Sequence, residues 1–367
     1  MPKRELYVGL MSGTSLDGVD AVVVDLAQPD PCVLAATGLP LEDALRSELL
    51  ALNEPGIDEL GRAALAGGAL ARAYASAVHA VLAQAGVQAR DIRAIGCHGQ
   101  TVRHRPELGY TIQLGNPALL AELTGIAVAC DFRSRDIAAG GQGAPLVPAL
   151  HSRIFGSAAE DRAVLNLGGI ANITWLPCNG TVLGFDSGPA NCLLDLWVAR
   201  HLQRPCDSEG AWGAQGKNDP ELLELMQREA YFHAPHPKST GRDLFNEAWL
   251  SRHLAARSTA LRPADVQATL MELTAWSVRT GLEACGDPAM LIVCGGGTKN
   301  RALMALLSRE LAPLRVVSSA TMGVDPDYVE AIAFAWLARQ TVVGEAGNLP
   351  AVTGAQGPRV LGGLYPR

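Results

Sequence analysis

The sequence predicts an α/β protein built from two similar halves. Each half opens with an apolar strand, a glycine-containing turn and a second apolar strand, at 6–26 in the first half and at 163–176 in the second. With 367 residues the chain exceeds one average domain, and its 48% apolar and 18% charged residues provide for a packed core. These observations favour a duplicated α/β unit with a cleft between the copies.

In the first half the pattern predicts four strands and one long helix. The strands are expected at 6–11, 19–26, 32–36 and 92–97, and the helix at 58–85. The first two strands form a hairpin around the glycine-containing turn. The helix is rich in alanine, with Asp58 as its N-cap and Gly86 as its stop.

The second half repeats this order of elements. Strands are expected at 163–167, 170–176, 182–185 and 290–294, and helices at 190–201, 300–311 and 325–342. Asp186 is predicted at the carboxyl end of its strand, and Pro189 at the first helical position, where a missing N–H costs nothing. Asp325 and Pro326 are predicted to start the last of these helices.

The predicted domains follow from this order. The first domain covers 1–135, with the segment 343–367 packing back on it, and the second covers 136–342. The region 203–250 fits neither copy, because it is polar and interrupted by glycine and proline. We interpret it as an insertion whose KSTGR sequence at 238–242 forms part of the substrate pocket.

Charge and cysteine usage limit the classes of partner. The formal charge is −7 with acids and bases interspersed, so no nucleic-acid partner is expected. Any polyphosphate must then be bound by backbone N–H groups, helix N-termini and a divalent cation. We expect no membrane span, because the sequence has no stretch of about 18 uncharged apolar residues. The eight scattered cysteines indicate buried thiols in a reducing cytoplasm.

Three glycine-containing turns, each at the end of an apolar strand, indicate a nucleotide site. Alone, one such turn is an ordinary hairpin or permits tight strand–helix packing. Together they suit a nucleotide held across a cleft, with backbone and hydroxyl donors on its phosphates, and Asp17 is suited to hold a hydrated Mg²⁺. The candidate nucleotide-binding residues are Ser12, Gly13, Thr14, Ser15, Asp17, Gly18, Asn166, Gly168, Gly169, Gly295, Gly296 and Gly297.

Asp186 is the candidate general base. A carboxylate where a strand ends and a helix begins lies at the edge of an α/β sheet that commonly binds ligands. The alternative is an N-cap for the helix that follows, a role that Ser187 can also fill.

Three further features are candidate pocket groups. They are the turn after the strand 92–97, the charged run 131–136 and Glu330. Each has an ordinary alternative, because a charged run is often a solvated loop and an acid in a first helical turn complements the helix dipole.

Six stretches of the chain resemble the anhydro-N-acetylmuramic acid kinases. They are GLMSGTSLDGVD at 9–20, CHGQT at 97–101, DFRSRD at 131–136, NLGGIAN at 166–172, GFDSGP at 184–189 and PKSTGR at 237–242. Their order is that of the family, and they span essentially the whole chain.

The resemblance implies the actin-like ATPase fold, in which two ribonuclease-H-like domains surround a nucleotide cleft. It implies that ATP and Mg²⁺ are used to phosphorylate the 6-oxygen of anhydro-N-acetylmuramic acid while the 1,6-anhydro ring is hydrolysed, in peptidoglycan recycling. By the family's pattern Asp186 is the base, and a homodimer is common. The implied sugar contacts are His98, Gln100, Asp131, Arg133 and Glu330.

Two alternatives stay open. An actin-like kinase for another small sugar or a carboxylic acid would share the three turns and use Asp186 to deprotonate a hydroxyl group. A regulator that senses nucleotide without chemistry would also bind ATP, but it would not depend on Asp186 for turnover.

Overall fold

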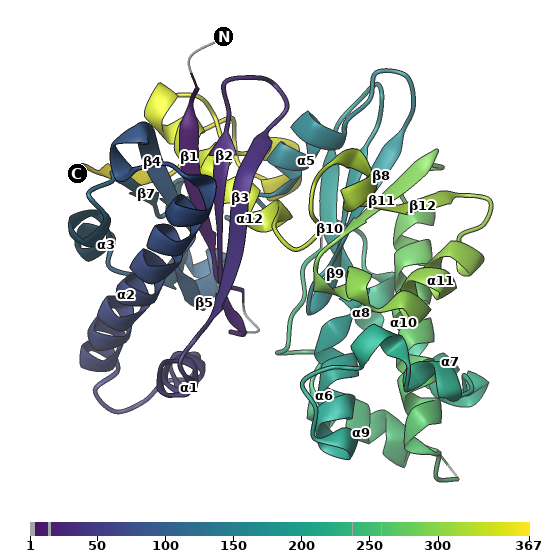
Figure 1. The fold of residues 1–367 in the computed structure, drawn as a ribbon. Coiled ribbons are helices and arrows are strands. Elements are labelled where there is room, and N and C mark those ends of the chain that lie inside the picture. Colours follow the sequence, from purple (N-terminus) through teal and green to yellow (C-terminus); the bar gives the residue numbers. More distant parts are fainter. Residues whose placement is uncertain (1–3, 14–15, 237, 258) are drawn as a thin grey trace. The chain divides into compact units, whose positions relative to one another are not determined.

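The computed structural model describes residues 4–13, 16–236, 238–257 and 259–367. The chain forms two compact units, coloured along the sequence in Figure 1. The first comprises the described residues up to Ile154 together with Tyr328–Arg367, and the second comprises Phe155–Asp327. The boundaries expected from the sequence, after 135 and after 342, therefore lie at other residues.

The first unit contains eight strands among its described residues. They are β1 (Leu6–Met11), β2 (Gly18–Asp25), β3 (Cys32–Pro40), β4 (Ile92–Cys97), β5 (Gln100–Arg105), β6 (Tyr110–Leu114), β7 (Val128–Cys130) and β13 (Gly363–Tyr365). Its α-helices are α1 (Asp43–Ala51), α2 (Glu59–Ala85), α3 (Pro117–Thr124), α4 (Ser134–Ala138), α5 (Pro148–Phe155, ending at the boundary), α12 (Val329–Val343) and α13 (Pro350–Thr353).

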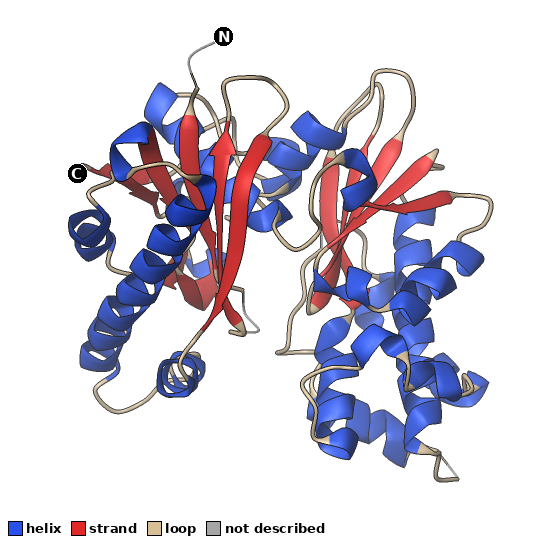
Figure 2. Ribbon diagram, in the orientation of Figure 1, coloured by secondary structure: helices blue, strands red, loops and turns tan. Residues whose placement is uncertain are grey.

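The second unit has its own sheet and helices, shown in red and blue in Figure 2. Its strands are β8 (Arg162–Leu167), β9 (Ile170–Leu176), β10 (Leu183–Pro189), β11 (Met290–Cys294) and β12 (Arg315–Ser318). Its α-helices are α6 (Asn191–Leu202), α7 (Pro220–Gln227), α8 (Ala230–His233), α9 (Glu247–Ala255), α10 (Pro263–Glu283) and α11 (Arg301–Glu310).

Both sheets share a five-stranded topology, to which the first sheet adds β13 as a sixth strand. In the first unit the order is β13-β7-β4-β1-β2-β3, where β1, β2 and β3 form an antiparallel meander and β4 and β7 continue in parallel from β1. In the second unit the order β10-β9-β8-β11-β12 repeats this arrangement, with β11 and β12 parallel to β8. Two ribonuclease-H-like units are therefore present, which confirms the predicted duplicated α/β fold.

The first sheet is packed between helices on its two faces. Leu70, Tyr74 and Val78 of α2 join a core with side chains of β1, β2 and β4. On the other face α12 lies so close that a Cβ on Gly9 or Gly96 would stand 1.8 Å from a carbonyl oxygen of α12. Glycine at these two positions therefore sets the distance between α12 and the sheet.

Helix α2 is long and apolar enough to cross a membrane by length and composition alone. It is instead a core helix in this fold, since 56% of its most apolar window is buried inside the unit and the helix packs on β2, β3 and α3. Gly86 ends it in the left-handed conformation at φ 66°, as predicted, whereas Asp58 occupies the N-cap without a side-chain capping bond.

The C-terminal segment completes the first unit. Strand β13 pairs antiparallel with β7, and Asn348 and Thr353 donate to Oδ1 of the buried Asp136 at 2.6 and 2.7 Å. The other oxygen of Asp136 accepts from the backbone N of Gly143 at 2.8 Å. These bonds hold the region after residue 135 in the first unit, which explains why the boundary lies further along the chain.

Several local predictions were wrong. Strand β10 continues to Pro189 and α6 begins at Asn191, so Pro189 is not the first helical residue and Asp186 lies inside the strand. Helix α12 begins at Val329 after a turn at Asp327, so Asp325 does not start it. All eight cysteines are free, but buried thiols are found only at Cys97, Cys192 and Cys294, while Cys32 and Cys206 are exposed and the other three are half-buried.

Because Gly96 faces the α12 backbone, we expect Gly96→Ala to lower the free energy of unfolding by about 2–3 kcal/mol through overpacking. The matched control is Gly68→Ala in α2, where an added methyl meets nothing within 4 Å. That change should raise stability by about 0.5–1 kcal/mol, because glycine inside a helix is entropically costly. Urea denaturation of both variants measures the difference, and equal stabilities would contradict the close approach of α12.

Candidate functional site

Asp186 of β10 is held at both carboxylate oxygens. Its Oδ1 accepts from the Asn172 amide at 2.8 Å, and its Oδ2 accepts from Ser239 Oγ and from the backbone N of Thr240, both at 2.9 Å. The backbone of Asp186 is fixed as well, since its N donates to the Lys238 carbonyl at 3.0 Å and its O accepts from the Tyr231 hydroxyl at 2.7 Å. The carboxylate therefore has a defined position and orientation.

Local strand geometry places Asp186 opposite Asn172. The two residues are partners in the antiparallel pairing of β10 with β9, and the register shifts between Asp186 and Gly188. Ser187 is buried and donates to the Ala171 carbonyl at 3.2 Å. Because α6 begins only at Asn191, neither Asp186 nor Ser187 caps that helix, and the N-cap alternative for Asp186 is excluded.

Burial raises the pKa of the Asp186 carboxyl above its ordinary value, because the charged form loses hydration. The hydrogen bonds from Asn172, Thr240 and Ser239 favour the charged form and oppose this rise. Burial and the nearby Asp186 also raise the pKa of Tyr231, which keeps that phenol a hydrogen-bond donor. A carboxylate with a raised pKa and fixed donors is chemically suited to accept a proton.

The segment that carries Ser239 and Thr240 lies in the predicted insertion. Lys238 anchors it, because its Nζ donates to the carbonyls of Tyr231 and Phe232 at 3.1 and 2.9 Å. The sequence predicted that the KSTGR stretch forms part of the substrate pocket, but it did not predict that Ser239, Thr240 or Asn172 donates to Asp186. Finding them requires the β9–β10 register and a contact across more than 50 residues in sequence.

The second and third glycine-containing turns lie against each other in the second unit. Gly295, with φ 85°, approaches so closely that a Cβ there would stand 2.4 Å from Asn166 Oδ1. The carbonyls of Gly168 and Gly169 accept from backbone N–H groups at the start of α6, at 3.0–3.1 Å. Gly296 has open space around its Cα, since an added Cβ would meet nothing within 4 Å.

The first turn follows β1, and its side chains differ in exposure. Ser12 is buried, with its Oγ 2.7 Å from the Tyr74 hydroxyl and 2.9 Å from Gln100 Oε1. Ser12 thus bonds to both Gln100 and Tyr74, and the sequence did not predict Tyr74 as a partner. Asp17 is 77% exposed and lies 3.8 Å from the Arg46 guanidinium. Thr14 and Ser15 lie outside the described residues, so their predicted roles have no structural account.

The structure places no group of three or more His, Cys, Asp or Glu side chains with metal-binding geometry among the residues it describes. Asp17 is thus a single exposed carboxylate at its turn. This fits a Mg²⁺ ion that takes most of its ligands from phosphates and water, since Mg²⁺ in kinases commonly uses only one or two carboxylates.

His98, Arg133 and Glu330 come together in the first unit. Nε2 of His98, which directly follows β4, is 2.9 Å from Arg133 Nη2, and Arg133 Nη1 donates to the Gly143 carbonyl at 2.8 Å. The His98 ring packs on Phe334 of α12 with ring centres 4.7 Å apart. Glu330, in the first turn of α12, is close enough to Arg133 for each charge to shift the pKa of the other.

Burial dominates the electrostatics of this group. It lowers the pKa of His98 to about 3, assisted by the Arg133 charge, so the imidazole is neutral near pH 7 and its Nε2 accepts from Arg133. Burial lowers the pKa of Arg133 to about 10, against the influence of Glu330 and Asp136. Burial raises the pKa of Glu330, and Arg133 opposes this while Asp20 adds to it.

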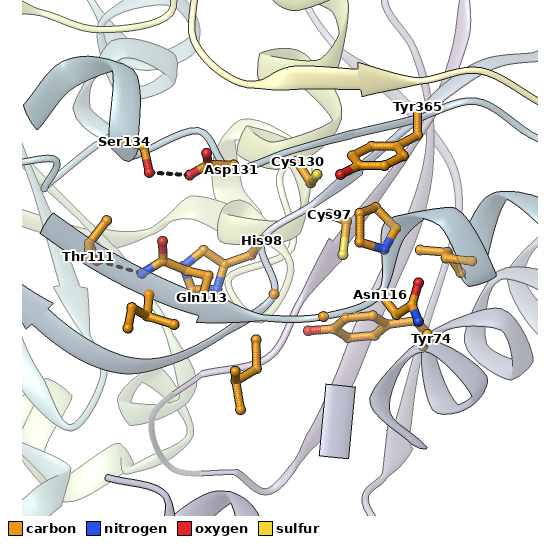
Figure 3. Close-up of a pocket in the computed structure, with 17 residues that line it drawn as sticks. Tyr74, Cys97, His98, Thr111, Gln113, Asn116, Cys130, Asp131, Ser134 and Tyr365 are labelled. Atoms are coloured by element: carbon orange, nitrogen blue, oxygen red, sulfur yellow. Dashed lines mark hydrogen bonds between the residues drawn. The ribbon is translucent and has the colours of Figure 1, made fainter. Parts of the chain in front are cut away.

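A pocket of about 280 Å³ lies beside His98 in the first unit (Figure 3). Asp131 lines it with φ 57° and accepts a hydrogen bond from Ser134 Oγ at 2.5 Å. Of the five predicted sugar contacts, His98 and Asp131 line this pocket, while Arg133 and Glu330 join His98 in the charged group. Gln100 belongs to the buried Ser12 network.

The sequence profile of the family described as Anhydro-N-acetylmuramic acid kinase matches residues 5–367. The chain belongs to this family. A kinase of that name from Cupriavidus pinatubonensis is 56% identical over 368 residues, covering 98% of each chain. One from Thiobacillus denitrificans is 54% identical, covering 99% of this chain and 98% of the relative.

Solved structures with a similar arrangement are more distant. An activator of 2-hydroxyisocaproyl-CoA dehydratase from Clostridium difficile, with bound ADPNP, has a TM-score of 0.49 at 12% identity and covers 90% of this chain and 92% of its own. The ROK hexokinase from Thermus thermophilus has a TM-score of 0.37 at 16% identity, covering 91% of this chain and 99% of its own.

Removing the Asn172 amide should raise the pKa of Asp186 further, because a hydrogen bond that favours the charged form is lost. In the Asn172→Ala variant the carboxyl carbon of Asp186, followed by ¹³C NMR, is expected to titrate at higher pH than in the native chain. The control is Asn179→Ala in the exposed turn after β9, which should leave that titration unchanged. A titration that moves to lower pH would contradict the assigned bond.

Proposed function

We propose that the chain is an ATP-dependent kinase that hydrolyses the 1,6-anhydro ring of anhydro-N-acetylmuramic acid and phosphorylates its 6-oxygen, giving N-acetylmuramic acid 6-phosphate. The observation that carries this proposal is the Asp186 carboxylate, which is desolvated and oriented by Asn172, Ser239 and Thr240. Membership of a kinase family whose profile matches residues 5–367 supports the substrate.

In the proposed reaction Asp186 accepts a proton from a water molecule that attacks the anomeric carbon, as the base carboxylate of an inverting glycosidase does. The bond between the anomeric carbon and the bridging oxygen breaks, and that 6-oxygen keeps the electron pair. It then bonds to the γ-phosphorus of ATP while ADP leaves, so no general acid is needed for the leaving oxygen. The proton on Asp186 returns to solvent after the product has formed.

The glycine-containing turns are proposed to bind ATP. The backbone at Gly296 is open to a ligand, whereas Gly295 is closely packed against Asn166 of the second turn. This combination suits contact with a nucleotide. Mg²⁺ would neutralise phosphate charge when bound, and Asp17 is proposed to hold it through a water molecule. Donors from the turn at 12–18 would contact the phosphates.

The charged group in the first unit is proposed to bind the sugar. Arg133, fixed by His98 and Gly143, offers a cation for the lactyl carboxylate, and Glu330 offers an acceptor for a sugar hydroxyl. The same proposal includes a cytoplasmic role in peptidoglycan recycling. The homodimer expected from the resemblance stays a prediction.

Asp186→Asn should reduce turnover by about 10²–10⁴-fold, because the amide cannot accept the proton, while ATP affinity is kept. The matched control, Asp287→Asn at an exposed position of the second unit, should keep native turnover. Steady-state kinetics and calorimetric titration of ATP measure the two properties. A native level of turnover in Asp186→Asn would favour the regulator that senses nucleotide without chemistry.

Oxygen-18 water distinguishes this kinase from one for an ordinary sugar. With ATP, Mg²⁺ and anhydro-N-acetylmuramic acid, mass spectrometry should find a sugar heavier by one phosphoryl group and one labelled water. A kinase that merely phosphorylates a hydroxyl would add no water. The absence of any ATP-dependent product would overturn the substrate assignment.

A further inference from the structure

The pocket beside His98 contains two buried polar atoms that the structure leaves without partners. Nδ1 of His98 and Oε1 of Gln113 are both buried, both residues line the pocket, and neither atom has a hydrogen-bond partner among the residues described. His98 is only 6% exposed. Leaving such atoms unsatisfied is costly, so their presence in one pocket indicates a ligand that supplies the missing bonds.

The hydrogen-bond networks decide which atom donates and which accepts. His98 is neutral and its Nε2 accepts from Arg133, so the ring proton is on Nδ1, a donor. Thr111 Oγ1 donates to the Arg103 carbonyl at 3.2 Å, so it must accept from Gln113 Nε2 at 2.8 Å. That bond leaves Gln113 Oε1 as an acceptor. The pocket thus presents one donor and one acceptor.

The charge of the lining excludes an anionic substituent. Among the described residues that line the pocket, Asp131 is the one acidic side chain, and none is a lysine or an arginine. Arg133 is on the Nε2 side of the His98 ring and does not line the pocket. A carboxylate or phosphate placed here would meet no cation and would be repelled by Asp131. The pocket therefore suits an uncharged polar group.

One wall of the pocket is apolar in character. In Figure 3, Cys97, Cys130 and Tyr365 lie on one side of His98, and Thr111, Asp131 and Ser134 lie on the other. Burial raises the pKa of Cys97 to about 12 and that of Cys130 to about 11, so both are uncharged thiols that pack as small apolar groups. A methyl group would find matching contacts there.

We propose that this pocket binds an uncharged carboxamide substituent of the substrate, whose carbonyl accepts from His98 Nδ1 and whose N–H donates to Gln113 Oε1. The inference rests on the proposed function, in which this substituent is the acetamido group of the sugar. Gln113 thereby determines specificity for the acetamido group.

The test compares anhydro-N-acetylmuramic acid with the same anhydro sugar carrying a hydroxyl in place of the acetamido group. The native chain should prefer the acetamido sugar in kcat/KM, and Gln113→Met should reduce that preference about tenfold, since the amide N–H loses its acceptor. Gln113→Glu keeps an acceptor at the same position and should retain most of the preference. Tyr110→Leu, in the same strand but outside the pocket lining, should retain all of it.

A native preference in a folded Gln113→Met variant would overturn the carboxamide pocket while leaving the kinase proposal intact. No product from the native chain would instead overturn the proposed function, and this inference with it. Saturation-transfer NMR of the sugar on the native chain gives a readout that needs no variant. The acetamido methyl should receive more saturation than the ring protons, and the reverse order would overturn the proposal.

Discussion

The close approach of helix α12 to the first sheet is the constraint on which that unit's candidate site depends. Gly9 of β1 and Gly96 of β4 carry no Cβ, so the α12 backbone rests directly on the two central strands. This brings Phe334 against the His98 ring and Glu330 within electrostatic reach of Arg133. The second unit uses glycine similarly, since a Cβ on Gly188 would stand 2.9 Å from Ser277 of α10.

Asp186 and Glu330 are half-buried carboxyl groups whose pKa values are raised, and they have different surroundings. Asp186 is oriented by uncharged donors, so its charge is stabilised by dipoles and remains available to a proton. Glu330 faces the Arg133 cation, and Asp20 adds a second negative charge nearby. The first arrangement suits proton transfer and the second suits a polar ligand that can share the guanidinium.

The strands β1–β4 and β8–β11 and the long helix α2 could be predicted from the sequence because apolar periodicity and glycine placement repeat in both halves. The strands β5, β6, β7, β12 and β13 were not predicted. The sequence predicted Asp186 as the candidate base at the end of a strand, but not its place inside β10, because the strand continues past it to Pro189. Asn172 contacts Asp186 because the register of β9 and β10 places the two residues opposite each other. Ser239 contacts Asp186 because the predicted insertion folds back onto β10. The partners of Ser12 could not be predicted either, because Tyr74 of α2 contacts Ser12 only once α2 has packed on the sheet, and Gln100 is 88 residues away in sequence.

The last residues of the chain complete a unit that the first residues begin. Strand β13 adds to β7, Asn348 and Thr353 bond the buried Asp136, and Tyr365 lines the pocket beside His98. A ribosome releases these residues only after the whole of Phe155–Asp327 has emerged. The nascent chain therefore presents an unfinished first sheet, with an unpaired edge at β7, throughout synthesis of the second unit. Its pocket becomes complete only after the second unit has been synthesised.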